Sequence, residues 1–134
     1  MKILAVDYGD SRTGLATCDR TEFLTTAITP QITLKARPKV AAEVCRIAQE
    51  QKAELIVVGL PLNMDGTEGS RCVKSRRFAA RLATACGVPV VLWDERRTTV
   101  TAAGILSANS TFGADRKARL DSVSAAVILE SFLA

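Results

Sequence analysis

The amino-acid sequence predicts an α/β fold, a five-stranded mixed sheet flanked by helices. Three short apolar segments joined by turns occupy residues 3–28, which indicates an antiparallel meander. Two later apolar strands alternate with helical segments, which indicates parallel strands joined by crossovers. The 134 residues are 48% hydrophobic, which suits a single domain over residues 1–134 with a proper core.

The first strand is the run Lys2 to Gly9, which is apolar until it reaches Asp7 and then a glycine. Its shortness and its closing turn favour a buried strand over a helix. Asp7 would then stand at the carboxyl end of the strand, where open α/β sheets bind their ligands. The alternative is that Asp7 only opens the following turn.

The other elements follow from the same patterns. Residues 15–19 read as the second strand, and residues 23–28 as a weaker third strand that Pro30 ends. The remaining predicted elements are a helix over 37–52, a strand over 54–59, a helix over 70–86, a strand over 90–93, a helix over 99–106, a polar loop over 107–119 and a last helix over 120–133.

Helical spacing identifies the sides of the two middle helices that face the core. In the first, these residues are Val40, Val44, Ile47 and Ala48. In the second, they are Val73, Ala79, Leu82, Ala83 and Cys86.

This element order is that of the ribonuclease H-like fold. The expected sheet has an antiparallel part made of the first three strands. The first, fourth and fifth strands are parallel, and the first lies beside the fourth. Fold alone does not decide function.

Composition excludes several kinds of site. The chain has no histidine, so it lacks the base of the usual serine or cysteine nucleophile systems and the commonest nitrogen ligand of zinc. Its four cysteines are widely spaced and form no Cys-x-x-Cys pair, so neither a zinc site nor a disulfide framework is expected. Neither a membrane span nor a secretory signal is visible, and a cytoplasmic location is expected.

The net charge of +4 is unevenly distributed. One basic segment contains Arg71, Lys74, Arg76, Arg77 and Arg81, and another contains Arg116, Lys117 and Arg119. Within the first, Ser70, Lys74, Arg77 and Arg81 share one helix face by their spacing. Such a face suits a polyanion, although most charged helix faces are merely solvated.

Three acids stand where a metal site could form: Asp7, Glu95 and Asp121. Strand order would bring them to one edge of the sheet, where clustered carboxylates need a cation between them. Oxygen ligands suit Mg²⁺ or Mn²⁺, which can support phosphodiester hydrolysis without histidine. The alternatives are helix-dipole stabilisation by Asp121 and a surface ion pair for Glu95; Asp94 is interpreted as structural.

Two glycine-bearing segments could bind phosphate. Gly9 and Gly14 have P-loop spacing, but Leu15-Ala16 replaces the required Lys-Ser/Thr, so a P-loop is excluded. The same segment resembles the first phosphate loop of the sugar-kinase/Hsp70/actin ATPases, which close two such domains over a nucleotide. The loop with Asn63, Gly66 and Gly69 precedes a helix and is a candidate phosphate loop, or an ordinary connection.

Four motifs occur in order along the chain: Asp7-Tyr8-Gly9 with Arg12 and Gly14-Leu15-Ala16; the eleven residues 59–69; Asp94-Glu95-Arg96 with Thr98-Thr99; and Lys117 with Asp121 and residues 125–129. Together they resemble the YqgF (RuvX) family of Holliday-junction resolvases and pre-16S ribosomal RNA nucleases. Arg97 and Ser122 depart from the pattern, at positions where apolar residues are usual.

The resemblance implies a Mg²⁺- or Mn²⁺-dependent nuclease acting on branched DNA or ribosomal RNA precursor, with Asp7, Glu95 and Asp121 as catalytic metal ligands. The basic residues that would bind nucleic acid are Arg12, Lys74, Arg77, Arg81, Arg96 and Lys117. Cutting a symmetric junction would call for a homodimer. The alternatives are a non-catalytic ribosome-assembly or transcription factor and a nucleotide phosphohydrolase.

Overall fold

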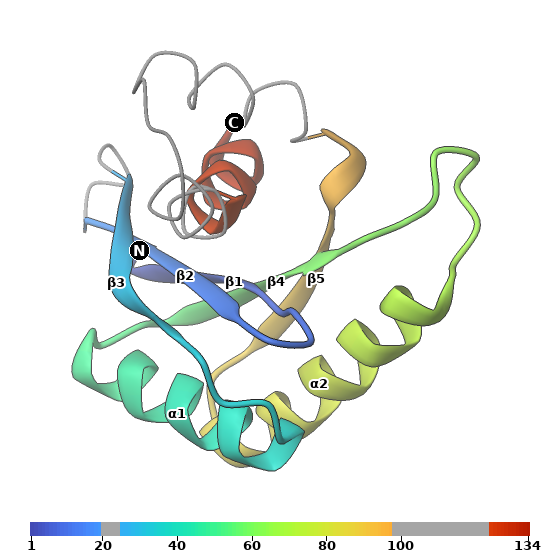
Figure 1. Ribbon diagram of the computed structural model, residues 1–134. Helices are drawn as coiled ribbons and strands as arrows, with labels where there is room; N and C mark the ends of the chain where they lie inside the picture. The colour runs from blue at the N-terminus through green and yellow to red at the C-terminus, as the bar shows by residue number, and fades with distance from the viewer. Residues whose placement is uncertain (20–24, 98–123) are drawn as a thin grey trace.

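The computed structural model describes residues 1–19, 25–97 and 124–134 (Figure 1). Its strands are β1 (Ile3–Asp7), β2 (Thr13–Cys18), β3 (Thr25–Ile32), β4 (Leu55–Leu60) and β5 (Val90–Asp94). Its helices are α1 (Arg37–Glu50), α2 (Ser70–Cys86), a 3-10 turn over Glu95–Arg97, and a helix over residues 124–133, here called the C-terminal helix. Within the described residues, no helix is long and apolar enough to span a bilayer.

The five strands form one mixed sheet in the order β3-β2-β1-β4-β5, as predicted. β1 pairs antiparallel with β2, which pairs antiparallel with β3. β4 runs parallel to β1 on one side and to β5 on the other. The carboxyl ends of β1, β4 and β5 therefore reach the same edge of the sheet, which places Asp7 and Glu95 near each other in space.

Helices cover both faces of the sheet (Figure 1). α1 and α2 lie on one face, where Leu4, Val6 and Phe78 belong to the larger core cluster. The C-terminal helix lies on the other face, where Ile128 packs in a cluster with Ile3 and Ala5 of β1. Because β1 is covered on both sides, its residues are apolar without interruption until Asp7, as is usual for a strand buried on both faces of a sheet.

Local signals explain the ends of α1 and α2. Proline lies in the first turn of α1, where its missing N–H costs no helical hydrogen bond. α2 has the predicted bounds and ends at Gly87, whose φ of 68° is the left-handed conformation that glycine adopts readily. The four predicted core residues of α1 are buried.

The predicted inner face of α2 was partly wrong. Val73 is 45% exposed and Ala83 is exposed, whereas Cys72, Ser75 and Phe78 are buried. The aromatic ring decides the rotation of the helix, because Phe78 stacks on Tyr8 with ring centroids 4.2 Å apart and is fully buried. Burying the larger ring removes more apolar surface from water than burying Val73 would.

The prediction that Pro30 ends the third strand was also wrong. β3 continues through Pro30 to Ile32. Its pairing with β2 is irregular between Thr13 and Leu15, and β3 is the edge strand of the sheet. Edge strands and bulges are the places where a sheet tolerates proline, because no ladder hydrogen bond needs its N–H.

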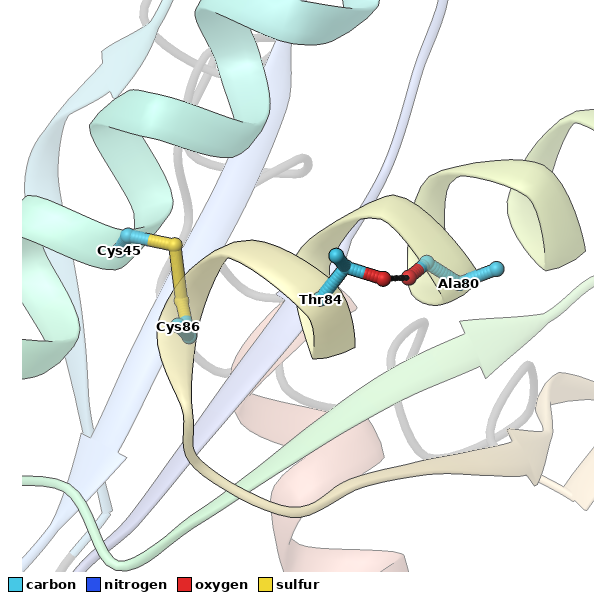
Figure 2. The surroundings of a disulfide bond; sticks show 4 residues. All are labelled: Cys45, Ala80, Thr84 and Cys86. Carbon is cyan, nitrogen blue, oxygen red and sulfur yellow. Dashed lines mark hydrogen bonds between the residues drawn. A yellow bond between two sulfur atoms is a disulfide. The ribbon is translucent and has the colours of Figure 1, made fainter.

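A disulfide joins Cys45 of α1 to Cys86 at the end of α2, contrary to the expectation of no disulfide (Figure 2). The two residues are 41 positions apart and meet because the helices pack together. No cysteine spacing in the sequence indicates this pair. Cys18 and Cys72 are buried free thiols. The disulfide fastens the two helices on their shared face of the sheet.

The helix predicted over 99–106 and the loop over 107–119 lie outside the described residues. So do the start of the last predicted helix and the first residues of the predicted third strand. The described part of the last helix agrees with its prediction in being mostly apolar, and Ala125, Ile128 and Leu129 are fully buried.

Candidate active site

Asp7 is the last residue of β1 at the centre of the sheet. Strand alternation places its side chain on the same face as Ile3 and Ala5, which is the face that carries the C-terminal helix. The next residue, Tyr8, packs on the α2 side instead. A carboxylate therefore stands at the carboxyl end of a strand whose other residues are buried hydrocarbon.

Glu95 follows β5 and reaches back across β4 toward Asp7, with which it shares a side-chain hydrogen bond. Gly59 of β4 makes this approach possible. A Cβ atom on Gly59 would lie 2.8 Å from both Cγ and Cδ of Glu95 and 2.7 Å from Cδ1 of Ile128. A glycine inside a strand often marks such a close approach, a signal that the sequence analysis did not use.

The environment of Glu95 favours its protonated form. Burial, the negative charge of Asp7 and the hydrogen bond to Asp7 together raise the pKa of Glu95 from 4.5 to about 8, and burial is the largest cause. The nearby Arg71 guanidinium opposes this shift only in part. In the protein without metal, a proton held between the two carboxyl groups relieves their repulsion.

This pair fits a divalent cation. A cation would replace the shared proton, and carboxylate oxygens are the ligands that Mg²⁺ and Mn²⁺ prefer. The described residues contain no group of three acidic, histidine or cysteine side chains placed to hold a metal ion. Asp121, the third predicted ligand, lies outside the described residues, so its role stays a prediction.

Asp94 is turned to a different partner. Arg96 donates to both of its carboxylate oxygens, with Nη2 2.7 Å from Oδ2 and Nε 3.1 Å from Oδ1. The backbone N–H of Arg96 also donates to Asp94 Oδ1 at 2.9 Å. Asp94 thus orders the 3-10 turn that carries Glu95, and its negative charge also helps to raise the pKa of Glu95. The interpretation of Asp94 as structural stays a prediction. Arg96 Nη1 lies 3.5 Å from the carbonyl oxygen of Met64, so this turn also meets the loop after β4.

The basic residues of α2 divide into two groups. Lys74 pairs with Asp10 at 3.0 Å, and Arg76 pairs with Glu68 at 2.6 Å, so nearby acids partly neutralise both. Arg77 and Arg81 are exposed, as their predicted face requires, and have no ion-pair partner among the described residues. Arg71 was predicted to belong to the basic segment but not to the site, yet it is close enough to Glu95 to lower its pKa.

All the predicted phosphate contacts stay predictions, including those of Arg12 and Lys117. Arg12 is partly buried just before β2, at the turn that follows Asp7. Gly9 in this turn approaches the carbonyl oxygen of Arg12 so closely that a side chain would collide with it. Lys117 lies outside the described residues.

The candidate phosphate loop is held mainly by its own hydrogen bonds. The N–H of Asn63 donates to the carbonyl oxygen of Thr67 at 2.9 Å, and the N–H of Gly66 donates to that of Asn63 at 2.9 Å. Gly66 has a φ of 89°, which this turn needs. Of the three predicted residues, Gly69 is the one at the start of α2, where a helix can offer backbone donors.

Sequence comparison places the chain among known proteins. The family model RuvX, described as Holliday junction resolvase, matches residues 1–134. A protein of Syntrophus aciditrophicus (strain SB) named "Putative pre-16S rRNA nuclease" is 41% identical over 133 residues, which cover 99% of this chain and 88% of the relative. A protein of the same name from Anaeromyxobacter dehalogenans (strain 2CP-C) is 39% identical, with 99% and 96% covered.

Structural comparison agrees at the level of the fold. The structure of Thermus thermophilus RuvC matches with a TM-score of 0.60 at 14% identity, covering 99% of this chain and 96% of that one. The same protein in complex with Holliday junction substrate matches with a TM-score of 0.62 at 12% identity and the same coverage. These likenesses confirm the ribonuclease H-like fold, and the sequence match assigns the family: the chain belongs to the RuvX family.

Proposed function

We propose that this chain is a nuclease that uses a divalent metal ion to hydrolyse phosphodiester bonds in structured nucleic acid. The supporting observation is the hydrogen-bonded pair of Asp7 and Glu95 at the carboxyl edge of the parallel strands. Relatives named as rRNA nucleases and a family described as resolvases point to precursor 16S ribosomal RNA or a four-way DNA junction as substrate.

Asp7 and Glu95 would hold the metal ion, Mg²⁺ or Mn²⁺, and Asp121 would complete the ligand set. A bound ion of this kind activates water and stabilises the leaving oxygen of the phosphodiester. Glu95 must give up its proton before it can act as a ligand, so binding of metal and loss of that proton are linked. The chain has no histidine that could serve as base in place of these carboxylates.

The basic side chains would position the substrate by contacts to its backbone phosphates, which dominate the affinity of nucleic-acid binding. We assign this role to Arg12, Lys74, Arg77, Arg81, Arg96 and Lys117, and we assign Gly69 at the start of α2 as a backbone donor. Lys74 and Arg96 would have to exchange their present acidic partners for phosphate. A cytoplasmic location and a homodimer on a symmetric junction belong to the same proposal.

Cleavage assays test the proposal directly. A four-way DNA junction and a precursor 16S ribosomal RNA fragment are incubated side by side with Mn²⁺, Mg²⁺ or EDTA. The wild type is compared with Asp7→Asn and with Glu50→Gln. Glu50 lies on α1 with 63% of its side chain exposed and serves as a matched control. We expect cleavage that needs metal and Asp7 and is unaffected by Glu50→Gln. Salt-dependent binding without cleavage of either substrate would instead indicate a non-catalytic binding protein.

A further inference from the structure

A basic groove lies away from the acid pair, between the beginning of α1 and the second half of α2. Its volume is about 590 Å³, and its lining consists of Arg37, Arg77, Ala80, Arg81, Thr84 and Ala85. We refer to it as the arginine groove. Arg37 is the first residue of α1, and the other five belong to one side of α2.

The groove follows from the helix geometry. Positions 77, 80, 81, 84 and 85 of α2 are three or four residues apart and form a continuous stripe. Two alanines and a threonine leave space between the arginines, and the Thr84 hydroxyl is occupied because it donates to the carbonyl oxygen of Ala80 at 3.1 Å (Figure 2). The nearby Cys45–Cys86 disulfide keeps α1 against α2 (Figure 2). The hydrogen-bonding capacity of the groove therefore comes chiefly from its arginines.

The charge of the groove is uncompensated within the described residues. No acidic residue lines it, and none of its three arginines has an ion-pair partner in this part of the chain. Arg37 Nε is buried without a hydrogen-bond acceptor there. Elsewhere on the same two helices, Arg46 pairs with Glu50 and Arg76 pairs with Glu68. Three guanidinium groups that no lining carboxylate neutralises make this groove favourable for an anion.

A line of basic residues runs along α2 from the acid pair to the groove. Arg71, Lys74, Arg77 and Arg81 follow one another along α2 at steps of three, three and four residues. Arg71, at the start of this line, is close enough to Glu95 to lower its pKa. At about 1.5 Å per residue, the ten residues from Arg71 to Arg81 span roughly 15 Å. Backbone phosphates of one strand of a duplex recur about every 3.4 Å along its axis, so this corresponds to roughly four or five nucleotides.

We propose that the arginine groove binds a backbone phosphate of the substrate about four or five nucleotides from the cleaved bond. This inference rests on the proposed nuclease function and adds Arg37 as a positioning residue. A guanidinium can donate two parallel hydrogen bonds to a phosphate, so three arginines in one groove suit a phosphodiester well. The groove would hold one arm of the substrate while the acid pair meets the scissile phosphate.

Neutral backbone linkages provide a sharp test. The cleavage site is first mapped on the preferred substrate. Methylphosphonates, which carry no charge, then replace the phosphates three to six nucleotides from that site. Dissociation constants and cleavage rates are measured for the wild type, Arg37→Ala, Arg81→Ala and Arg46→Ala. Arg46→Ala is the matched control, because it removes the same charge from α1 at a position already paired with Glu43 and Glu50.

We expect Arg37→Ala to weaken binding of the unmodified substrate about five- to tenfold, with a larger effect on KM than on kcat. The methylphosphonates should cost the wild type and Arg46→Ala a similar factor, but cost Arg37→Ala a clearly smaller one, because part of the contact to that phosphate is already lost. Arg81→Ala should give the same pattern, and it serves as the second test if Arg37→Ala folds poorly in a thermal unfolding control.

Two outcomes would overturn the inference. One is an equal effect of the methylphosphonates on all four proteins. In the other, inorganic phosphate at constant ionic strength raises the thermal stability of the wild type but not that of Arg37→Ala, while the methylphosphonates affect the two proteins equally. This result would assign the groove to a free phosphate. Absence of cleavage by the wild type would contradict the proposed nuclease function instead, so the two failures are distinguishable.

Discussion

Replacing Gly59 with alanine tests how the acid pair is held together. The added Cβ would lie 2.7 Å from Ile128 Cδ1 and 2.8 Å from Cγ and Cδ of Glu95. Carbon atoms in favourable contact are about 3.5–4.0 Å apart, so each contact is too close by roughly 1 Å. Either the C-terminal helix or the Glu95 side chain must therefore move.

Ile128 and Glu95 differ in how easily their side chains can move away from the new Cβ. Ile128 is fully buried between the sheet and its helix, whereas Glu95 is partly buried at the edge of the sheet. Overpacking of this kind typically destabilises a protein by about 1–3 kcal/mol. A shift of Glu95 by about 1 Å would separate it from Asp7, and a misplacement of that size can reduce turnover about 100-fold.

Thermal unfolding and single-turnover cleavage are measured for the wild type, Gly59→Ala, Ile128→Val and the double variant. Ile128→Val removes the Cδ1 atom that the new Cβ would meet, without touching Glu95. We expect Gly59→Ala to unfold several degrees lower and to cleave about 100-fold more slowly. The double variant should recover part of the stability lost in Gly59→Ala, but little of the activity.

A folded Gly59→Ala variant that cleaves within threefold of the wild type would show that Gly59 is not needed to hold the acid pair. If Ile128→Val restored stability and cleavage together, the loss would come from the helix and not from the position of Glu95. The single Ile128→Val variant supplies the baseline, since deletion of a buried methyl group by itself costs about 0.5–1.5 kcal/mol.

Three further predictions concern the acid pair and the disulfide. Because the pKa of Glu95 is raised to about 8, the folded metal-free protein holds more protons than the unfolded chain between pH 4.5 and 8. Its stability should fall as pH rises through this range, by at most about 1.4 kcal/mol per pH unit from this group. Asp7→Asn should flatten that slope in urea titrations, though not abolish it, because burial of Glu95 remains; an unchanged slope would contradict the proton sharing. Mn²⁺ or Mg²⁺ should raise the midpoint of thermal unfolding of the wild type more than that of Asp7→Asn, and equal shifts would place the metal elsewhere. Reduction of the Cys45–Cys86 disulfide, which spans 41 residues, should lower the free energy of unfolding by about 4 kcal/mol on the chain-entropy model, with the Cys45→Ala/Cys86→Ala variant insensitive to reductant as control. If the denaturant midpoint of the wild type were the same with and without reductant, the disulfide would not contribute this stability.

The fold followed from local patterns. Apolar runs that end in turn residues identified the strands, helical spacing and α2's closing glycine identified the helices, and their order along the chain led to the observed sheet order. The errors arose where packing outweighed spacing. Phe78 set the rotation of α2 by stacking on Tyr8, and the edge position of β3 let the strand continue through Pro30.

For the site, the sequence by itself selected Asp7 and Glu95, because each follows an apolar strand at the ligand-binding edge, and it located the basic face of α2. Only the tertiary structure decided what these residues meet. Glu95 reaches Asp7 across 88 positions of sequence, and it does so because Gly59 leaves room on the strand between them. Arg37 and Arg81, and likewise Cys45 and Cys86, come together through the packing of α1 on α2. Periodicity acts over a few residues and can be read along the chain, whereas such contacts depend on the three-dimensional arrangement of elements that are distant in sequence.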